Sequence, residues 1–134
     1  MAKYNAAVFD MPMTACGDLN SSQYCFVKCA STAGRVMLAN GASGPQPLGI
    51  LQNDPKSLEE ATVRIYGTSK VYSTGSNAWG YGDFLMSGSV GQAELAITGS
   101  AVGGVAMDDV AAGASVYSEI LLLPFLSAFA DNTP

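Results

Sequence analysis

The chain of 134 residues offers few reactive side chains, and none of them is a histidine. Histidine is the most frequent general base, the usual partner of a serine or cysteine nucleophile, and the commonest metal ligand. Cys25 could act as a nucleophile only beside a base, and the nearby Lys28 is expected on the opposite face of the same strand. We therefore expect Cys25 to be a buried structural thiol.

The three cysteines, Cys16, Cys25 and Cys29, are expected to be free thiols in a reducing compartment, because no apolar secretory signal precedes them. A zinc site would need four ligands and the chain offers three thiols without histidine. On a strand, positions 25 and 29 would lie about 13 Å apart, which is too far for a disulfide. Neither a metal site nor a disulfide is predicted from these residues.

Two pairs of adjacent carboxylates, Asp108-Asp109 and Glu59-Glu60, are expected to be solvated turn acids, since neighbouring side chains in a strand or turn point apart. A weak calcium site at Asp108-Asp109 is the alternative, although the spacing of an EF-hand calcium loop is absent. Gly80-Tyr81-Gly82-Asp83 has neither the P-loop pattern nor a G-x-G-x-x-G between strand and helix, so it predicts a tight turn. No G-x-S-x-G motif is present. We assign no catalytic, cofactor-binding or metal-binding residue and expect no enzyme and no cofactor.

Trp79, Tyr81 and Phe84 could form a stacking platform for bases or sugar rings, or could pack in a core or a subunit contact. The chain carries 6 Lys and Arg against 11 Asp and Glu, a net charge of −5, and its cations are scattered singly. Nucleic-acid binding needs clustered cations to neutralise phosphates. We expect no nucleic-acid partner and favour packing for the three aromatic residues.

Short strands are expected to position all these residues, because no window of a dozen residues shows a helical apolar period free of glycine and proline. Alternating runs between turn residues predict strands at Tyr24–Ala30, Arg35–Ala39, Leu48–Leu51, Phe84–Met86, Ala93–Ile97, Ala101–Met107 and Ser115–Leu122. A hairpin is predicted over Thr62–Tyr72, with its turn at Gly67. The predicted fold class is all-β, a small β-barrel or sandwich of short antiparallel strands with an extended N-terminal arm.

The domain prediction divides the chain at residue 20. Residues 1–20 are expected to form the N-terminal arm, with one short strand around Ala6–Phe9, and residues 21–134 a single β-rich domain. The apolar C-terminal segment Leu121–Leu126 is expected either to pack as a last strand and anchor or to fill a groove on another chain. The longest apolar stretch, Ile120–Ala130, contains Pro124 and is too short to span a bilayer, so no membrane partner is expected.

A weak internal echo links two parts of the chain 55 residues apart. The first copy reads Gly49-Ile50-Leu51, Asp54, then Ala61, Val63 and Ile65; the second reads Gly104-Val105-Ala106, Asp109, then Val116, Ser118 and Ile120. Chance similarity between two β-turn-β units is one explanation. The other is a pseudo-repeat that closes a small barrel, in which both glycines let a neighbouring strand approach and both aspartates bond within their own turns.

Four stretches between Pro47 and Phe125 carry a resemblance in the order in which glycine, apolar and acidic residues follow one another. They are PLGILQND, ATVRIYGTSKVY, GYGDFLMSGSVGQ and VGGVAMDDVAAGASVYSEILLLPF. In these stretches the chain resembles the decoration, or cement, proteins of tailed-phage heads. The resemblance implies a β-rich virion structural protein on the exterior of an assembled capsid, present in the host cytoplasm during assembly. It also implies two partners, the major capsid protein and the chain itself as a homotrimer, and it brings no catalytic residues.

A second hypothesis is a soluble ligand-binding β-barrel, in which Trp79 and the tyrosines line an internal cavity for a sugar or an apolar ligand. It predicts a monomer, whereas the decoration hypothesis predicts a trimer or a larger assembly.

Overall fold

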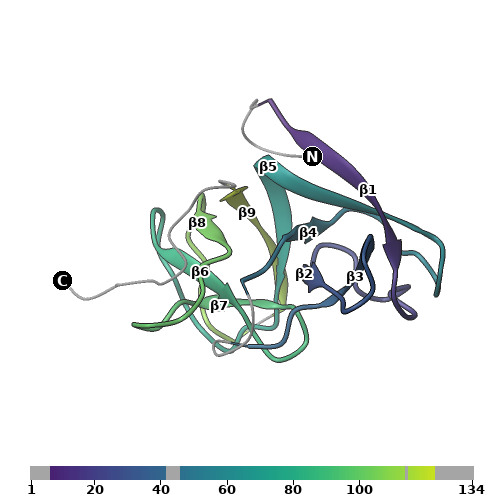
Figure 1. Cartoon of the computed structure of the whole chain (residues 1–134). Coiled ribbons are helices and arrows are strands. Elements are labelled where there is room, and N and C mark those ends of the chain that lie inside the picture. Colours follow the sequence, from purple (N-terminus) through teal and green to yellow (C-terminus); the bar gives the residue numbers. More distant parts are fainter. Residues whose placement is uncertain (1–6, 42–45, 114, 123–134) are drawn as a thin grey trace.

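The computed structural model describes residues 7–41, 46–113 and 115–122, which form strands and turns and no helix (Figure 1). The strands are β1 (Phe9–Ala15), β2 (Phe26–Cys29), β3 (Arg35–Leu38), β4 (Gly49–Leu51), β5 (Glu60–Ser73), β6 (Phe84–Ser87), β7 (Ala93–Leu95), β8 (Gly104–Ala106) and β9 (Val116–Leu122). The all-β prediction is confirmed, and the strands predicted between residues 24 and 122 outside β5 are found at their predicted places, with β6 extending one residue beyond its range, to Ser87. No described segment forms a helix long and apolar enough to cross a bilayer.

The strands close into two five-stranded rings that share β5. The order β1-β3-β2-β4-β5 closes because β1 also pairs with β5, and we call it the first ring. The order β5-β7-β6-β8-β9 closes because β9 also pairs with β5, and we call it the second ring. Figure 1 shows the purple and blue strands of the first ring on one side of the teal β5 and the green strands of the second ring on the other.

The predicted hairpin over Thr62–Tyr72 is wrong, because β5 is one continuous strand of 14 residues. Gly67 does have a left-handed backbone, with φ of 96°, but the chain continues through it without turning back. A Cβ at Gly67 would collide with the carbonyl oxygen of Ala7, so this glycine permits a close crossing of the chain before β1. The register of β1 against β5 also shifts beside Phe9, and such a bulge bends a strand. The bend lets one half of β5 serve each ring.

The N-terminal arm prediction needs correction for Phe9–Ala15, which form β1. This strand pairs antiparallel with β5 from Phe9 to Thr14 and parallel with β3 at Thr14 and Ala15. Pro12 is exposed at a paired position, and its neighbours Met11 and Met13 are partly buried. The short, proline-interrupted pattern concealed a strand that closes the first ring; residues 1–6 lie outside the described part of the chain.

Two pairings, β1–β3 and β5–β7, are parallel, whereas antiparallel strands were predicted. Parallel neighbours require a connection that crosses back over the sheet, and a helix usually provides it. Here the chain makes each crossing through an intervening strand, β2 in the first ring and β6 in the second. A fold without crossover helices can therefore still contain parallel pairs.

The two rings have the same topology, which supports the pseudo-repeat over chance similarity. Strands β1 to β5 of the first ring correspond, in order, to strands β5 to β9 of the second ring. Pairs that are parallel or antiparallel in the first ring are parallel or antiparallel, respectively, in the second. Four backbone hydrogen bonds of the first ring each have a counterpart at the equivalent place in the second ring. In the first ring they are Tyr24 N–Leu51 O, Leu48 N–Val27 O, Ala39 N–Phe26 O and Ala30 N–Arg35 O. Their counterparts in the second ring are, in the same order, Gly82 N–Ala106 O, Gly103 N–Leu85 O, Ala96 N–Phe84 O and Gly88 N–Gln92 O.

The glycines of the sequence echo occupy equivalent places. Gly49 pairs with Val27 on β2, and Gly104 pairs with Leu85 on β6. A Cβ at Gly104 would lie 2.7 Å from the carbonyl oxygen of Leu121, and one at Gly49 would collide with the backbone of β5. The predicted close approach of a neighbouring strand is confirmed at both positions.

Each ring encloses an apolar core to which all five of its strands contribute. The core of the first ring contains Ala15, Leu19, Val27, Val36, Leu51, Ala61 and Val63. The core of the second contains Val71, Trp79, Leu85, Ala93, Ala106, Val110, Ile120 and Leu122. Phe26, Ala39 and Ile50 belong to strands or ends of strands of the first ring but pack in the second core. The two rings are thus joined by buried side chains as well as by β5.

Candidate functional site

The junction between the rings is formed by a short segment of the first ring, Tyr24 to Phe26, which lies between two parts of the second ring. The carbonyl oxygen of Tyr24 accepts a hydrogen bond from the amide of Tyr72 on β5, at 2.9 Å. The amide of Phe26 donates to the carbonyl oxygen of Gly91, which precedes β7, at 2.7 Å. Tyr24 has a left-handed backbone with φ of 68°. This conformation is energetically unfavourable for residues other than glycine.

The side chain of Phe26 completes this junction. It is fully buried, and its ring lies so close to Gly103 that no side chain would fit there. Gly91 is similarly confined, since a Cβ on it would lie 2.7 Å from the carbonyl oxygen of Phe26. The glycines of the second ring therefore form an apolar seat for Phe26.

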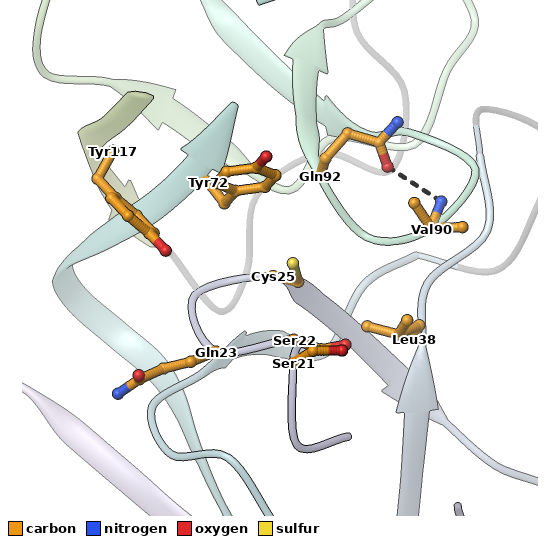
Figure 2. A pocket seen from close by; sticks show the side chains of 9 residues that line it. All are labelled: Ser21, Ser22, Gln23, Cys25, Leu38, Tyr72, Val90, Gln92 and Tyr117. Atoms are coloured by element: carbon orange, nitrogen blue, oxygen red, sulfur yellow. Dashed lines mark hydrogen bonds between the residues drawn. The ribbon is translucent and has the colours of Figure 1, made fainter. Parts of the chain in front are cut away.

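A cavity of about 460 Å³ opens beside the junction (Figure 2). Its lining comes from both rings: Ser21, Ser22, Gln23, Cys25, Leu38, Tyr72, Val90, Gln92 and Tyr117. Gln92 orders the neighbouring loop because its Oε1 accepts a hydrogen bond from the amide of Val90, at 3.0 Å. The lining contains hydroxyl, amide and thiol groups but no carboxylate and no cation, so it offers hydrogen bonds without an ionised base.

Cys25 lies in this lining as a buried free thiol. Burial raises the pKa of Cys25 from 9.0 to about 11, because the thiolate would lose its hydration. A thiol of this kind is protonated at neutral pH and is a poor nucleophile. The prediction of a buried structural thiol is confirmed for Cys25, while Cys16 and Cys29 are free and exposed. Lys28 donates instead to the side chain of Asn40, at 3.1 Å.

The carboxylates brace turns. Asp83 accepts from the amide of Gly80 at 2.9 Å, which confirms the tight turn predicted there. Asp109 accepts from the amide of Tyr81 at 2.8 Å, so its bond reaches a distant loop and the predicted bond within its own turn is wrong. In the described part of the chain, no three Cys, Asp or Glu side chains lie close enough together to hold a metal ion.

The corresponding turn of the first ring is braced by Asn53. This side chain donates to the carbonyl oxygen of Glu60 and accepts from the amide of Thr62. Glu59 accepts from the amide of Lys56 at 2.8 Å, and both acids of the Glu59-Glu60 pair are exposed.

Trp79, Tyr81 and Phe84 are not brought together as a stacking platform. Trp79 is buried in the second core, Tyr81 is exposed, and Phe84 is half-buried against a small satellite cluster. Trp79 does not line the cavity, so the part of the ligand-binding hypothesis that placed it there is wrong. Packing is the role that the structure supports for Trp79 and Phe84.

A cluster of three tyrosines beside the cavity was not predicted. The ring of Tyr117 lies 5.6 Å from that of Tyr24 and 5.5 Å from that of Tyr72, and Lys70 lies over the ring of Tyr24 at 5.7 Å. Tyr72 and Tyr117 are register partners of β5 and β9. The sequence contains no local signal for a pairing between such distant segments, so the cluster could not be found from it.

Large apolar side chains are exposed at several places on the surface: Val8, Phe9, Met37, Leu58, Tyr66, Tyr81, Val90, Ile97 and Tyr117. Three of them form what we call the β1–β5 patch. Phe9 and Tyr66 face each other in the β1–β5 register, and Val8 lies against Gly67. Contiguous exposed apolar side chains mark surfaces that bind other macromolecules.

No protein-family model and no curated protein sequence matches the chain. Its fold is similar to a solved structure, the N base of the head fiber protein gp8.5 of bacteriophage phi29, with a TM-score of 0.65 and 16% sequence identity. The similarity covers 94% of this chain and 100% of that chain. The fold of this chain is therefore one that a phage head fiber base also adopts.

Proposed function

We propose that the chain is a structural protein of a phage head, which decorates and stabilises an assembled capsid by binding the lattice of the major capsid protein. In this proposal it binds the exterior of the shell as a homotrimer, is present in the host cytoplasm during assembly, and catalyses no reaction. The observation that carries the proposal is the similarity of nearly the whole chain to the base of a head fiber. That neighbour is described as the base of a head fiber, so the decoration of a shell is our extension.

The distribution of side chains supports a role in binding surfaces. Both ring interiors are filled by packed side chains, and the described cavity lies between them at the junction. Apolar residues are instead exposed on the outer faces. Many weak identical contacts on a symmetric shell would give tight attachment through avidity, without any need for a deep pocket.

The β1–β5 patch is the surface that we assign to the shell. Phe9 is 55% exposed and Tyr66 is 43% exposed, and neither side chain is needed to fill a core. We expect Phe9→Glu to weaken co-sedimentation with shells assembled from the major capsid protein of the same genome by at least about tenfold. Val90→Glu is the matched control, because Val90 is 59% exposed and lines the cavity at the ring junction, to which no residue of this patch contributes.

Because β1 closes the first ring, deletion of residues 1–20 would remove part of the fold and could not test an arm. Deletion of residues 1–6 leaves β1 intact and tests whether the segment before it contributes to attachment. Wild-type protein that fails to sediment with the shells at any concentration would refute decoration. Equal attachment of the Phe9→Glu and wild-type proteins would refute the assignment of the patch.

A ligand-binding module is the second candidate, and the cavity at the ring junction is the observation that favours it. Tyr117 is exposed at its edge and Gln92 provides amide groups, a combination suited to a sugar ring. Saturable binding from a panel of monosaccharides and oligosaccharides, lost in Tyr117→Ala, would support this function. A flat response of the wild type across the panel would remove it.

A further inference from the structure

The two parts of the internal junction, an inserting segment and a receiving site, have equivalents elsewhere in the molecule that are not joined to each other. These equivalents identify how one copy of the chain could bind another. At the junction, the first ring inserts the backbone of Tyr24 to Phe26 between Tyr72 and Gly91 of the second ring. Because the rings are topological repeats, the inserting segment and the receiving site each have an equivalent elsewhere in the molecule.

The equivalent of the inserting segment is Gly82 to Phe84, at the start of β6. Gly82 has φ of 91°, so it shares the left-handed backbone of Tyr24. Its amide bonds to the end of β8 as the amide of Tyr24 bonds to the end of β4. Gly82 is exposed and Phe84 is half-buried, whereas Phe26 is fully buried. The second ring thus presents the same segment with nothing in the described chain inserted against it in the manner of the junction.

The equivalent of the receiving site lies between Thr14 and Gly34 of the first ring. There the amide of Thr14 donates directly to the carbonyl oxygen of Gly34, at 3.0 Å. At the junction the corresponding groups of Tyr72 and Gly91 are held apart and bond to the inserted segment. Gly34 is exposed, and a Cβ on it would meet nothing within 4 Å. The receiving site of the first ring is therefore present and closed by one hydrogen bond.

We propose that Gly82 to Phe84 of one copy inserts between Thr14 and Gly34 of a second copy and repeats the internal junction between chains. The Thr14–Gly34 hydrogen bond is exchanged for two: Thr14 N to the carbonyl oxygen of Gly82, and Phe84 N to the carbonyl oxygen of Gly34. The contact joins unlike surfaces, so it propagates from chain to chain until the rotation closes a ring of copies. The inference deepens the proposed self-association and rests on that part of the proposed function.

The side chains favour a second copy as the occupant. Cys25 and Gln92 line one cavity at the internal junction, and the equivalent residues are Asp83 and Arg35. Asp83 of one copy would therefore face Arg35 of the next, which places opposite charges across the contact. Leu48, the partly buried residue equivalent to Gly103, has a side chain where the internal junction has none, so Phe84 would pack against Leu48 and enter less deeply than Phe26 does. The contact between chains thus has a pair of opposite charges, Asp83 and Arg35, where the internal junction has two neutral side chains.

The test is the mass of the purified full chain in solution, measured by light scattering over a concentration series. We expect the wild type to form an oligomer of defined size, the proposed trimer. Asp83→Arg and Arg35→Asp should each weaken association by at least about tenfold, and the double variant should regain it. Lys56→Asp is the matched control for loss of an exposed cation and should associate as the wild type does.

Cysteine cross-linking provides a second measurement that does not depend on the charge variants. In a background of Cys16→Ser and Cys29→Ser, the pair Gly34→Cys and Asp83→Cys should form a disulfide between chains, as the close approach of Gly91 and Cys25 indicates. The pair Gly34→Cys and Val90→Cys should not. A monomeric wild type without cross-links, or single charge variants that associate as the wild type does, would overturn the inference.

The two proposals can fail separately. Oligomers that depend on Asp83 and Arg35 but do not bind shells would support this contact between copies and refute decoration. A wild-type protein that is monomeric in solution and still binds shells would support decoration and refute this contact between copies.

Discussion

The two rings share one topology but differ in what fills them. Among the residues that the structure describes, Ser22 is the one buried polar residue of the first ring. Those of the second ring are Thr68, Ser69, Ser73, Ser87, Gln92, Ser100, Ser118 and Glu119. The apolar core of the second ring is supplemented by Phe26, Ala39 and Ile50 from the first. The first core receives no buried side chain from β6 to β9. The same strand order therefore tolerates different interiors, and the second ring depends on the first for part of its core.

The largest expected effect follows from that dependence. Phe26→Ala should lower the free energy of unfolding by about 3–5 kcal/mol, because it leaves a cavity in the second core. Phe84→Ala, at the equivalent position, should lower it by about 1 kcal/mol, because its side chain is half-buried and loses less apolar contact. Urea unfolding monitored by circular dichroism measures both.

Hydrogen exchange distinguishes the rings in the Phe26→Ala variant. Amides of β6 to β9 should lose more protection than those of β1 to β4. Equal loss in both rings, or equal destabilisation by Phe26→Ala and Phe84→Ala, would contradict the one-sided dependence.

The shared strand provides the next comparison. Gly67→Ala should cost about 2–4 kcal/mol, since the new Cβ would adopt a left-handed backbone and collide with Ala7. Gly99 also has a left-handed backbone, with φ of 88°, but its surroundings are open. Gly99→Ala should therefore cost only about 1 kcal/mol from the backbone alone. Thermal unfolding of the two variants separates strain from collision, and similar losses would show that the crossing over Gly67 is loose.

A charged pair in the first ring has an uncharged counterpart in the second. Arg64 donates to both oxygens of Asp10 at 2.8 and 3.1 Å, and these residues are register partners. The pair that matches them in the second ring is Thr68 with Leu121.

Asp10→Thr alone should cost about 1–2 kcal/mol, since Arg64 keeps its partial burial without the carboxylate. The double variant Asp10→Thr and Arg64→Leu should lie within about 1 kcal/mol of the wild type, because the second ring uses the same pair. Denaturation midpoints of the single and double variants measure the difference. A double variant that is less stable than the single would show that the rings are not interchangeable here.

The sequence predicted local strands well and their long-range pairing poorly. Alternation and turn residues were sufficient for β3 and β9, whose polarity pattern is set by the adjacent core. β5 was divided at Gly67 because a glycine inside an alternating run is usual in a turn, and only the crossing chain shows why it is needed here. β1 was missed because Pro12 interrupts it. The echo around Gly49 and Gly104 was the one sequence signal of the two rings.

The candidate surfaces were less predictable than the strands. The inertness of Cys25 followed from the lack of a base, but its place at the junction depends on the pairing of distant loops. Phe26 and Phe84 occupy equivalent places, yet one is fully buried and the other is not. Burial at these positions depends on which ring lies next to them, and no property of the neighbouring residues encodes it.

The last expected effect appears only at high pH and concerns Cys25, the residue that corresponds to Asp83 in the second ring. Its pKa is raised to about 11 in the folded chain, against 9.0 for an unperturbed thiol. Between pH 9 and 11 the unfolded chain releases this proton while the folded chain retains it, so the wild type should lose stability relative to Cys25→Ala as pH rises through that interval. Below pH 9 the difference between the two proteins should be constant, because the thiol is neutral in both states. Parallel melting curves from pH 7 to 11 measure this difference and cancel the titration of lysines and tyrosines common to both proteins. If the difference stayed constant throughout, the thiol would be hydrated, and the junction would be more open than its packing indicates.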